Sequence, residues 1–133
     1  MCRTFACRAL LILIPQGNLK TYPSQAEAEL GCLVSVGYGM TENTCGTFLT
    51  PLGDVPEITT KTVGYPIPGC NGKVIDPETE EILEEGQIGE LCTKGFMVFQ
   101  GYVGDPEKTA ESYTKDGWWK TGDLAVIENG VTR

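Results

Sequence analysis

The feature that most constrains the fold is a short buried strand that leads directly into a glycine-rich loop. Residues 32–36 (Cys-Leu-Val-Ser-Val) are apolar or β-branched and lie between glycines, which predicts a buried strand. Residues 23–30 are good helix formers, and Gly31 marks the predicted end of that helix. Open α/β sheets bind ligands at the carboxyl ends of their strands. The sequence therefore predicts an α/β piece whose residues 37–42 form a ligand-facing turn.

Beyond Pro51 the chain changes character, because glycine and proline become frequent and short strand-like runs alternate with turns. Only residues 106–112 are expected to be helical there, with Asp105 as N-cap and proline at the first helical position. The runs expected to be strands are residues 73–75, 88–94, 96–102 and 124–127. This pattern predicts a small antiparallel β-barrel or sheet subdomain beside the α/β piece, with a boundary near Pro56–Val63.

Composition excludes several classes of function. A net charge of −8 argues against nucleic acid or an anionic membrane as the main partner. The absence of histidine excludes catalysis that depends on imidazole. Six cysteines occur without a Cys-x-x-Cys pair, which indicates reduced thiols in an intracellular protein rather than a zinc site. Residues 76–90 carry seven carboxylates and no Lys or Arg, which predicts a solvated hairpin rather than an EF-hand calcium loop.

The N-terminal segment permits two interpretations. Residues 1–26 contain Arg3, Arg8 and Lys20 but no acidic residue. Residues 9–14 are apolar, yet six residues are too few to span a membrane. The segment is compatible with a mitochondrial leader or, in the alternative that the pattern favours, with a buried strand or an arbitrary chain start.

The turn at residues 37–42 (Gly-Tyr-Gly-Met-Thr-Glu) combines groups that suit a nucleotide with magnesium. Its glycines allow close approach of the backbone to a ligand. Tyr38 offers a ring for base stacking, Thr41 a hydroxyl for a phosphate oxygen, and Glu42 a hard oxygen ligand for Mg²⁺. The alternative is an ordinary strand-to-loop turn with a packing tyrosine.

A second string, residues 117–123 (Gly-Trp-Trp-Lys-Thr-Gly-Asp), follows a predicted hairpin turn at Asp116-Gly117. Trp118 and Trp119 are expected to be core or barrel-lining residues. Asp123 follows Thr121-Gly122, and a carboxylate on a tight turn accepts both hydroxyls of a ribose. The alternative is an aspartate that caps the turn. Residues 89–95 are expected to form a structural strand.

These strings together resemble the adenylate-forming superfamily, which includes acyl-CoA synthetases, luciferases and peptide-synthetase adenylation domains. The strings are, in order, residues 38–42 (Tyr-Gly-Met-Thr-Glu), 89–95 (Gly-Glu-Leu-x-x-x-Gly) and 118–123, which ends in Thr-Gly-Asp. The resemblance is greatest to medium-chain fatty-acyl-CoA ligases of the acyl-CoA synthetase family member 2 type. It is carried by Thr41-Glu42-Asn43 and by residues 101–109 (Gly-Tyr-Val-Gly-Asp-Pro-Glu-Lys-Thr). The resemblance covers residues 31–133.

The resemblance implies an ATP-dependent, AMP-forming ligase that joins a fatty acid to coenzyme A. Tyr38 would stack on adenine, Thr41 would contact the α-phosphate, Glu42 would bind Mg²⁺ and Asp123 would hold the ribose. Gly39 and Met40 would line the groove where the acyl group and AMP meet. ATP or AMP, Mg²⁺ and coenzyme A are the implied cofactors, and a mitochondrial location is implied, with the cytoplasm as the alternative.

Departures from the family pattern limit what this chain is expected to do. The family's Ser/Thr/Gly-rich loop, which ends in Lys-Gly and holds the β- and γ-phosphates, is missing from the sequence, and so is the C-terminal domain with its catalytic lysine. We therefore expect a fragment of the large N-terminal domain that does not turn over alone and is marginally stable. Its expected parts are an unmatched segment (1–30), the end of the α/β subdomain (31–60) and a β-rich, barrel-like subdomain truncated before the hinge (61–133). Two alternatives stay open, namely a non-catalytic nucleotide-binding or interaction module and another type of adenylating enzyme.

Overall fold

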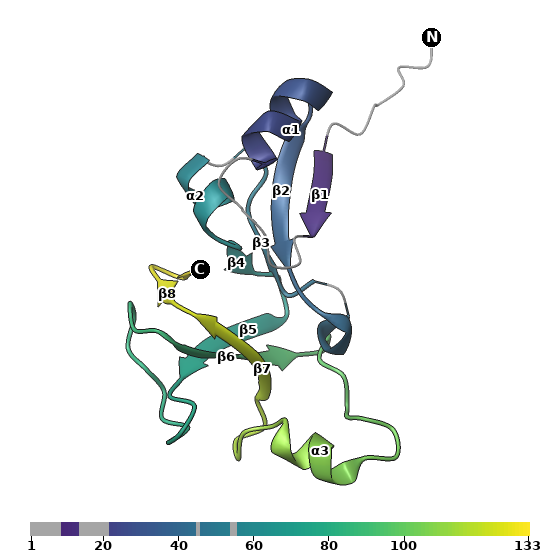
Figure 1. The fold of residues 1–133 in the computed structure, drawn as a ribbon, viewed down its shortest axis with the longest axis vertical. Helices are drawn as coiled ribbons and strands as arrows, with labels where there is room; N and C mark the ends of the chain where they lie inside the picture. The colour runs from purple at the N-terminus through teal and green to yellow at the C-terminus, as the bar shows by residue number, and fades with distance from the viewer. Residues whose placement is uncertain (1–8, 14–21, 45, 54–55) are drawn as a thin grey trace.

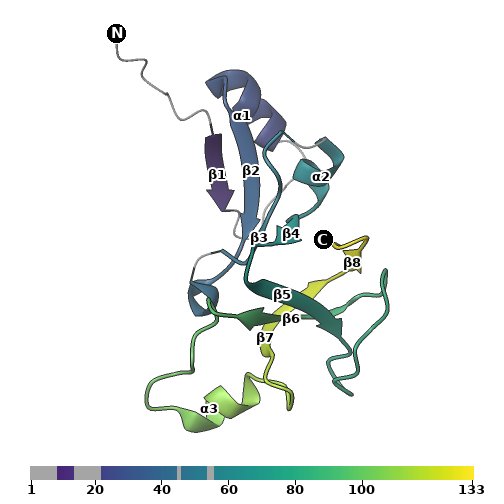
Figure 2. The same ribbon diagram turned by 180° about the vertical axis from the view of Figure 1, so that it is seen from behind.

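The structure, a computed structural model, describes residues 9–13, 22–44, 46–53 and 56–133. These residues form two main sheets, one above the other in Figure 1, with helices α1 and α2 beside the upper sheet and helix α3 at the lower end. Figure 2 shows from behind the same separation of the two sheets along the long axis of the molecule.

The upper sheet has the order β1-β2-β3-β4, in which β1 runs parallel to β2 and the other neighbours are antiparallel. The helices α1 and α2 contact each other and β2. The bounds of these elements are β1 Ala9–Leu13, α1 Tyr22–Leu30, β2 Leu33–Tyr38, β3 Phe48–Leu49, α2 Pro56–Lys61 and β4 Tyr65–Pro66.

The connection from α1 to β2 forms as the sequence predicts. The helix ends at Gly31, whose φ of +62° lies in the left-handed region that favours glycine. The amide of Gly31 donates to the carbonyl of Glu27 (2.9 Å), and the Glu27 carboxylate accepts from the amide of Val34 (2.9 Å). One helical residue thus closes the helix end and fixes the start of the strand.

The lower sheet is antiparallel throughout, with the order β5-β6-β7. A short β8-β9 hairpin then returns to the upper sheet. There the carbonyl of Thr132 accepts from the amide of Val63 (2.9 Å), and the amide of Thr132 donates to the carbonyl of Gly64 (2.8 Å). The bounds are β5 Cys70–Ile75, β6 Gly89–Gly95, α3 Pro106–Glu111, β7 Trp119–Ala125, β8 Ile127–Glu128 and β9 Val131–Thr132.

Among the residues whose burial the structure describes, one apolar cluster joins the two sheets. Its buried members are Phe48 from β3 and Val74, Leu91 and Ala125 from the lower sheet, and Tyr38 packs against it. The described strands change sheets between Pro66 and Cys70. Because the core spans both sheets, the carboxyl end of β2 is held against the lower sheet.

The predicted fold class is confirmed as an α/β piece followed by a small antiparallel β-sheet, with one correction. No closed barrel forms among the residues that the structure describes, because β5, β6 and β7 make an open three-stranded sheet. The strand interpretation of the N-terminal apolar run is confirmed by β1, whereas residues 1–8 and 14–21 lie outside the described residues. In the described ranges, no helix is long and apolar enough to cross a bilayer.

Two predicted strands are wrong in detail. Residues 96–102 form a turn and a loop instead of a strand, because the amide of Val98 donates to the carbonyl of Gly95 (3.2 Å) and turns the chain out of the sheet. Their apolar character has another cause, since Phe99 packs in an aromatic group with Tyr102 and Trp119. The predicted strand at 124–127 is divided at Val126, between β7 and β8.

The helices beyond Pro51 were only partly predicted. Helix α3 is confirmed, and Asp105 caps it by accepting from the amide of Lys108 (2.9 Å). Helix α2 was missed. It spans six residues (Pro-Glu-Ile-Thr-Thr-Lys) with three β-branched side chains, so its local helix propensity is low.

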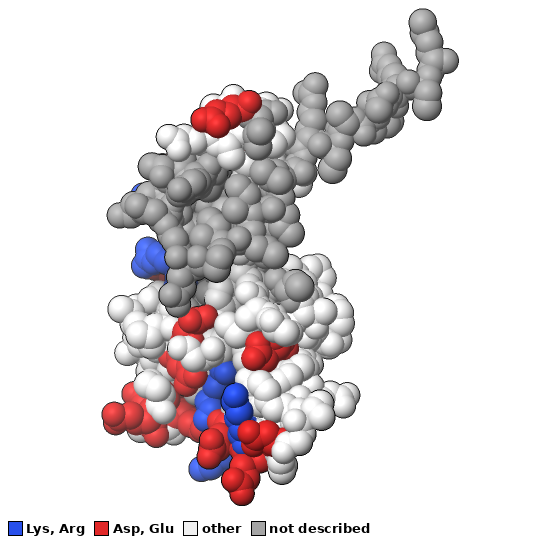
Figure 3. All heavy atoms as spheres, turned by 45° about the vertical axis from the view of Figure 1, so that its right-hand side comes forward, with Lys and Arg blue, Asp and Glu red and all other residues white. Residues whose placement is uncertain are grey.

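The acidic segment at 76–90 is the predicted solvated hairpin between β5 and β6. The Asp76 carboxylate accepts from the amides of Glu78 (2.8 Å) and Thr79 (3.0 Å), which closes the turn. Figure 3 shows acidic residues around basic residues at the lower end of the molecule. Within the hairpin, the Glu80 carboxylate pairs with the ammonium of Lys120 at 3.3 Å.

Candidate functional site

The first predicted site segment is partly strand. Gly37 and Tyr38 belong to β2, and Gly37 pairs with Leu13 on one side and Leu49 on the other. Gly37 is therefore ordinary extended backbone rather than part of a turn, which corrects that expectation. Gly39 and Met40 follow as a short link into η1 (Thr41–Asn43), a single 3₁₀ turn.

The second predicted site segment is not a tight turn either. Thr121, Gly122 and Asp123 lie inside β7, where three residues stand opposite Leu91 alone. The hydroxyl of Thr121 donates to the carbonyl of Leu91 (2.8 Å) and accepts from the amide of Asp123 (3.1 Å). Gly122 has a φ of +79°, so this β-bulge requires a backbone that favours glycine. The bulge directs Asp123 away from the regular alternation of the strand.

The structure brings Tyr38 and Asp123 together, although 85 positions separate them in the sequence. The phenol of Tyr38 donates to Oδ2 of Asp123 at 2.6 Å. The ring of Tyr38 packs edge-on against Phe48, with centroids 5.9 Å apart. Burial, and then the hydrogen bond to Asp123, raise the pKa of the Tyr38 hydroxyl. The two residues predicted to hold adenine and ribose therefore share one place at the junction of the sheets.

Glu42 lies on η1 and is held by the loop that follows β6. The phenol of Tyr102 donates to Oε1 of Glu42 at 3.0 Å, and the amide of Phe99 donates to the Glu42 carbonyl at 2.8 Å. Glu42 is half-buried, whereas Thr41 beside it is exposed. Thr41, predicted to contact phosphate, and Glu42, predicted to bind metal, thus follow Tyr38 by three and four residues on the same short segment.

The residues present fit a magnesium ion only together with phosphate. In the described part of the chain, no group of three or more Asp, Glu, Cys or His side chains is placed to hold a metal. Glu42 supplies one carboxylate. Since Mg²⁺ usually binds proteins through one or two carboxylates plus waters and substrate phosphates, a cation at Glu42 would take its other ligands from water and phosphate oxygens.

The two tryptophans have different environments. Trp119 is buried, as predicted, and packs edge-on against Phe99 at 5.9 Å. Trp118 is only half-buried, and the ammonium of Lys73 lies 4.9 Å from its ring centroid. Residues 89–95 form β6, which confirms the structural assignment of that string.

The cysteines that the structure describes are free thiols, as expected, and they are Cys32, Cys70 and Cys92. Cys2, Cys7 and Cys45 lie outside the described residues. Burial raises the pKa of the fully buried Cys92 thiol to about 12, which makes it unreactive at neutral pH.

Two site residues were missed by the sequence reasoning. Asn43 is fully buried beside Glu42, and its Oδ1 accepts from the hydroxyl of Thr93 on β6 (3.2 Å). Tyr102 contacts Glu42 directly. Asn43 belongs to the Thr41-Glu42-Asn43 motif and Tyr102 to the motif at residues 101–109. Their place in these two family motifs was the only sign in the sequence that they belong to the site. A pairing over 50 or 60 positions has no local pattern from which it could be read.

Known proteins share both the sequence and the fold. The family described as "AMP-binding enzyme" matches residues 20–103. The long-chain-fatty-acid–CoA ligase 1 of Homo sapiens is 49% identical over 108 residues, which cover 80% of this chain and 15% of that ligase. The mitochondrial medium-chain acyl-CoA ligase of Bos taurus is 38% identical over 70% of this chain and 15% of that ligase. An atromentin synthetase of Suillus grevillei is 38% identical over 83% of this chain and 12% of that protein.

Solved structures agree with these matches. Apo MatB from Rhodopseudomonas palustris superimposes with a TM-score of 0.81 at 34% identity, over 95% of this chain and 24% of MatB. The ATP-bound form of MatB gives a TM-score of 0.74 at 37% identity, over 84% of this chain and 22% of MatB. The chain spans 12–15% of the length of the two acyl-CoA ligases and the atromentin synthetase, and less than a quarter of MatB. By its matched residues, its fold and its site strings, the chain belongs to the AMP-binding family of adenylate-forming enzymes.

Proposed function

We propose that this chain contributes the adenosine-binding face of an AMP-forming fatty-acyl-CoA ligase. The observation that carries the proposal is the hydrogen bond of 2.6 Å between Tyr38 and Asp123. It supports a shared site for an aromatic base and a ribose diol. The half-buried ring of Tyr38 would stack on adenine, and the Asp123 carboxylate would accept from the ribose hydroxyls.

The remaining roles follow the chain from Tyr38. Gly39 and Met40 would line the groove in which the acyl group meets AMP. The exposed hydroxyl of Thr41 would donate to an α-phosphate oxygen, and Glu42 would hold Mg²⁺ against the phosphates. The bound cation would neutralise phosphate charge. These side chains supply positioning and charge stabilisation rather than covalent chemistry.

The proposed reaction has two steps. A carboxylate oxygen of the fatty acid attacks the α-phosphorus of ATP, so that an acyl–phosphate bond forms and pyrophosphate leaves. The sulfur of coenzyme A then attacks the acyl carbon, which forms the thioester, releases AMP and gives up the thiol proton. The small-molecule partners are therefore a fatty acid, ATP and coenzyme A. A mitochondrial location is proposed by analogy with the bovine relative, and the cytoplasm is the alternative.

A second candidate function is adenylation of another acid. The similarity to an atromentin synthetase supports this alternative. A non-catalytic nucleotide-binding or interaction module is a third candidate. The affinities of acyl-adenylate analogues with alkyl chains of increasing length, compared with the affinity of an aryl analogue, distinguish the fatty-acyl-CoA ligase from an enzyme that adenylates another acid. A fatty-acyl-CoA ligase should bind the octanoyl and longer analogues more tightly than the aryl one.

Calorimetric titration with AMP tests the proposal itself. Asp123→Asn should weaken AMP binding about 10- to 100-fold, because a hydrogen bond to a charged group contributes about 1.5–3 kcal/mol. The same variant should bind 2′,3′-dideoxy-AMP as the wild-type chain does, since that ligand has no diol. Asp76→Asn removes a charge from the acidic hairpin, where that carboxylate accepts from the amides of Glu78 and Thr79, and serves as the matched control. Equal loss for both ligands would contradict the ribose assignment.

A further inference from the structure

The loop that follows β6 is fastened to η1 by three hydrogen bonds. Two of them use backbone groups, since the amide of Phe99 donates to the Glu42 carbonyl and the hydroxyl of Thr44 donates to the Met97 carbonyl (both 2.8 Å). The third joins side chains, from the phenol of Tyr102 to Oε1 of Glu42 at 3.0 Å. The backbone bonds already tie the two segments together. The third bond acts specifically on the carboxylate.

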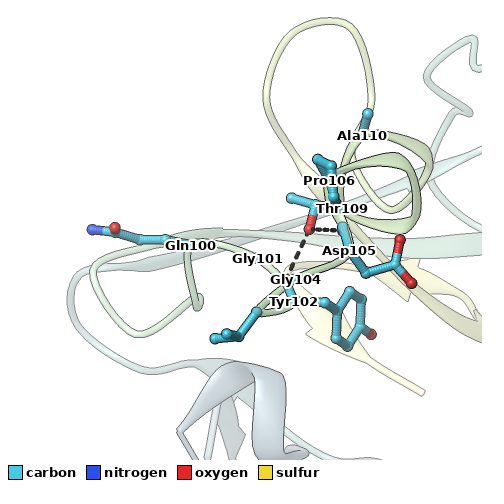
Figure 4. Close-up of a pocket in the computed structure, with 9 residues that line it drawn as sticks. Gln100, Gly101, Tyr102, Gly104, Asp105, Pro106, Thr109 and Ala110 are labelled. Atoms are coloured by element: carbon cyan, nitrogen blue, oxygen red, sulfur yellow. Dashed lines mark hydrogen bonds between the residues drawn. The ribbon is translucent and has the colours of Figure 1, made fainter.

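The direction of the Tyr102 phenol is fixed from several sides. Its ring meets the edge of Phe99 at 4.9 Å with an interplanar angle of 77°, and the Lys108 ammonium lies 4.3 Å from its centroid. Its amide donates to the hydroxyl of Thr109 at 2.9 Å, and that hydroxyl donates to the Asp105 carbonyl at 2.8 Å, as Figure 4 shows. The start of α3 therefore anchors the tyrosine.

The residue before Tyr102 is adapted to this arrangement. Gly101 has a φ of +143°, and a Cβ added there would lie 2.5 Å from Cγ2 of Thr109. Only glycine allows the chain to pass so close to the helix while it turns the tyrosine toward η1. The loop is thus built to present one hydroxyl to one carboxylate.

We propose that Tyr102 is a positioning residue that orients the Glu42 carboxylate for a divalent cation bound with nucleotide phosphates. The inference rests on the proposed function. With the phenol hydrogen-bonded to Oε1, the carboxylate would hold a fixed orientation and would leave Oε2 free for the cation. Carboxylates that bind metals are commonly held by such an outer hydrogen bond, and loss of the outer partner typically weakens metal binding 10- to 100-fold.

The test uses the whole 133-residue chain and the variant Tyr102→Phe, which removes one oxygen and keeps the ring between Phe99 and Lys108. Mn²⁺ affinity is measured at saturating ATP by the water-proton relaxation of Mn²⁺, and AMP affinity is measured without metal. The variant should bind Mn²⁺ about 10- to 100-fold more weakly and AMP equally well. Tyr65→Phe, which removes a hydroxyl from β4, is the matched control and should leave both affinities unchanged.

A double-mutant cycle separates positioning from general stability. Glu42→Gln should lose Mn²⁺ affinity, and adding Tyr102→Phe to it should cause little further loss, because both changes act through one carboxylate. Additive losses, or an unchanged Mn²⁺ affinity in Tyr102→Phe, would overturn the inference. A wild-type chain that binds no AMP would instead remove the proposed function, and the inference with it.

A measurement on the wild-type chain decides the matter if Tyr102→Phe does not fold. In a chain labelled with ¹³Cζ-tyrosine, the resonance of Tyr102 should shift when Mg²⁺ is added with ATP and should stay in place when AMP is added without metal. A Tyr102 resonance that is insensitive to Mg²⁺ with ATP would refute the positioning role.

Discussion

At the scale of single residues, Tyr38 connects the stability of the chain to its site. Its hydroxyl is neutral when it donates to Asp123, and burial also disfavours the phenolate. The pKa of Tyr38 is therefore higher in the folded chain than the value of about 10 for an unfolded tyrosine. Stability from this difference is present in full below pH 10 and is lost as the pH rises toward the folded pKa.

Tyr38→Phe tests this linkage. The variant should lower the free energy of unfolding by about 1–2 kcal/mol at pH 7, because one hydrogen bond to a carboxylate is lost. Above pH 10 it should lose stability less steeply than the wild-type chain. Urea unfolding between pH 7 and 11.5 measures both effects.

The control is Tyr65→Phe, which removes a phenol from a partly exposed side chain on β4 and should change the free energy of unfolding at pH 7 by less than about 0.5 kcal/mol. Tyr102 and Tyr113 also have raised pKa values, so part of the alkaline decline will persist in every variant. Parallel slopes for Tyr38→Phe and the wild-type chain would show that the Tyr38 hydroxyl does not carry the linkage.

Much of the candidate site was predictable at this scale, because strand ends and glycines locate loops. The short strings around Tyr38 and Asp123 named residues that the fold brings into contact. The partner of Glu42 was not predictable, since Tyr102 reaches it across 60 positions. The sequence predicts a tight turn where Gly122 forms a bulge, because both conformations favour a glycine with positive φ.

At the scale of elements, the close pairing of β5 with β6 depends on Gly89. A Cβ added there would lie 2.3 Å from the Ile75 carbonyl oxygen and 2.5 Å from Cδ1 of Leu83. Gly89→Ala should therefore shift one strand against the other and lower the free energy of unfolding by about 3 kcal/mol. Urea denaturation measures the loss.

Gly86→Ala is the matched control, because it lies in the same hairpin with a φ of +84° and no atom within 4 Å of an added Cβ. It should cost about 1 kcal/mol, from backbone strain alone. Equal losses for the two variants would mean that the strands are not packed as closely as the structure has them.

The elements that were predicted correctly have strong local signals. Helix α3 has an aspartate cap followed by proline, and β2 is apolar between glycines. The structure of the elements that were missed or misplaced depends on contacts with residues far away in the sequence. Helix α2 forms from a threonine-rich segment beside β2 and α1, and residues 96–102 leave the sheet to pack their aromatic rings.

At the scale of the whole molecule, the 133-residue polypeptide should not catalyse ATP–pyrophosphate exchange with octanoate. Its sequence contains neither the Lys-Gly phosphate loop nor the catalytic lysine that the family resemblance implies. Binding of AMP is a separate property, and a ligand at 100 times its Kd should stabilise the fold by about 2.7 kcal/mol. Exchange well above background would contradict the first expectation, and a chain without a thermal shift would contradict the second.

Substitution of Phe48 tests whether packing between the two sheets supports both the stability of the fold and the geometry of the site. It belongs to β3, is fully buried, and has Cζ 2.7 Å from the position of an added Cβ on Gly72 of β5. Phe48→Ala should lower the free energy of unfolding by about 3–5 kcal/mol. It should also weaken AMP binding, because the ring of Tyr38 packs edge-on against Phe48.

The control is Leu49→Ala. Leu49 lies beside Phe48 in the strand and is 37% exposed, so this variant should lower the free energy of unfolding by less than about 1 kcal/mol. If AMP affinity survives in a folded Phe48→Ala chain, the junction between the sheets does not set the geometry of the site.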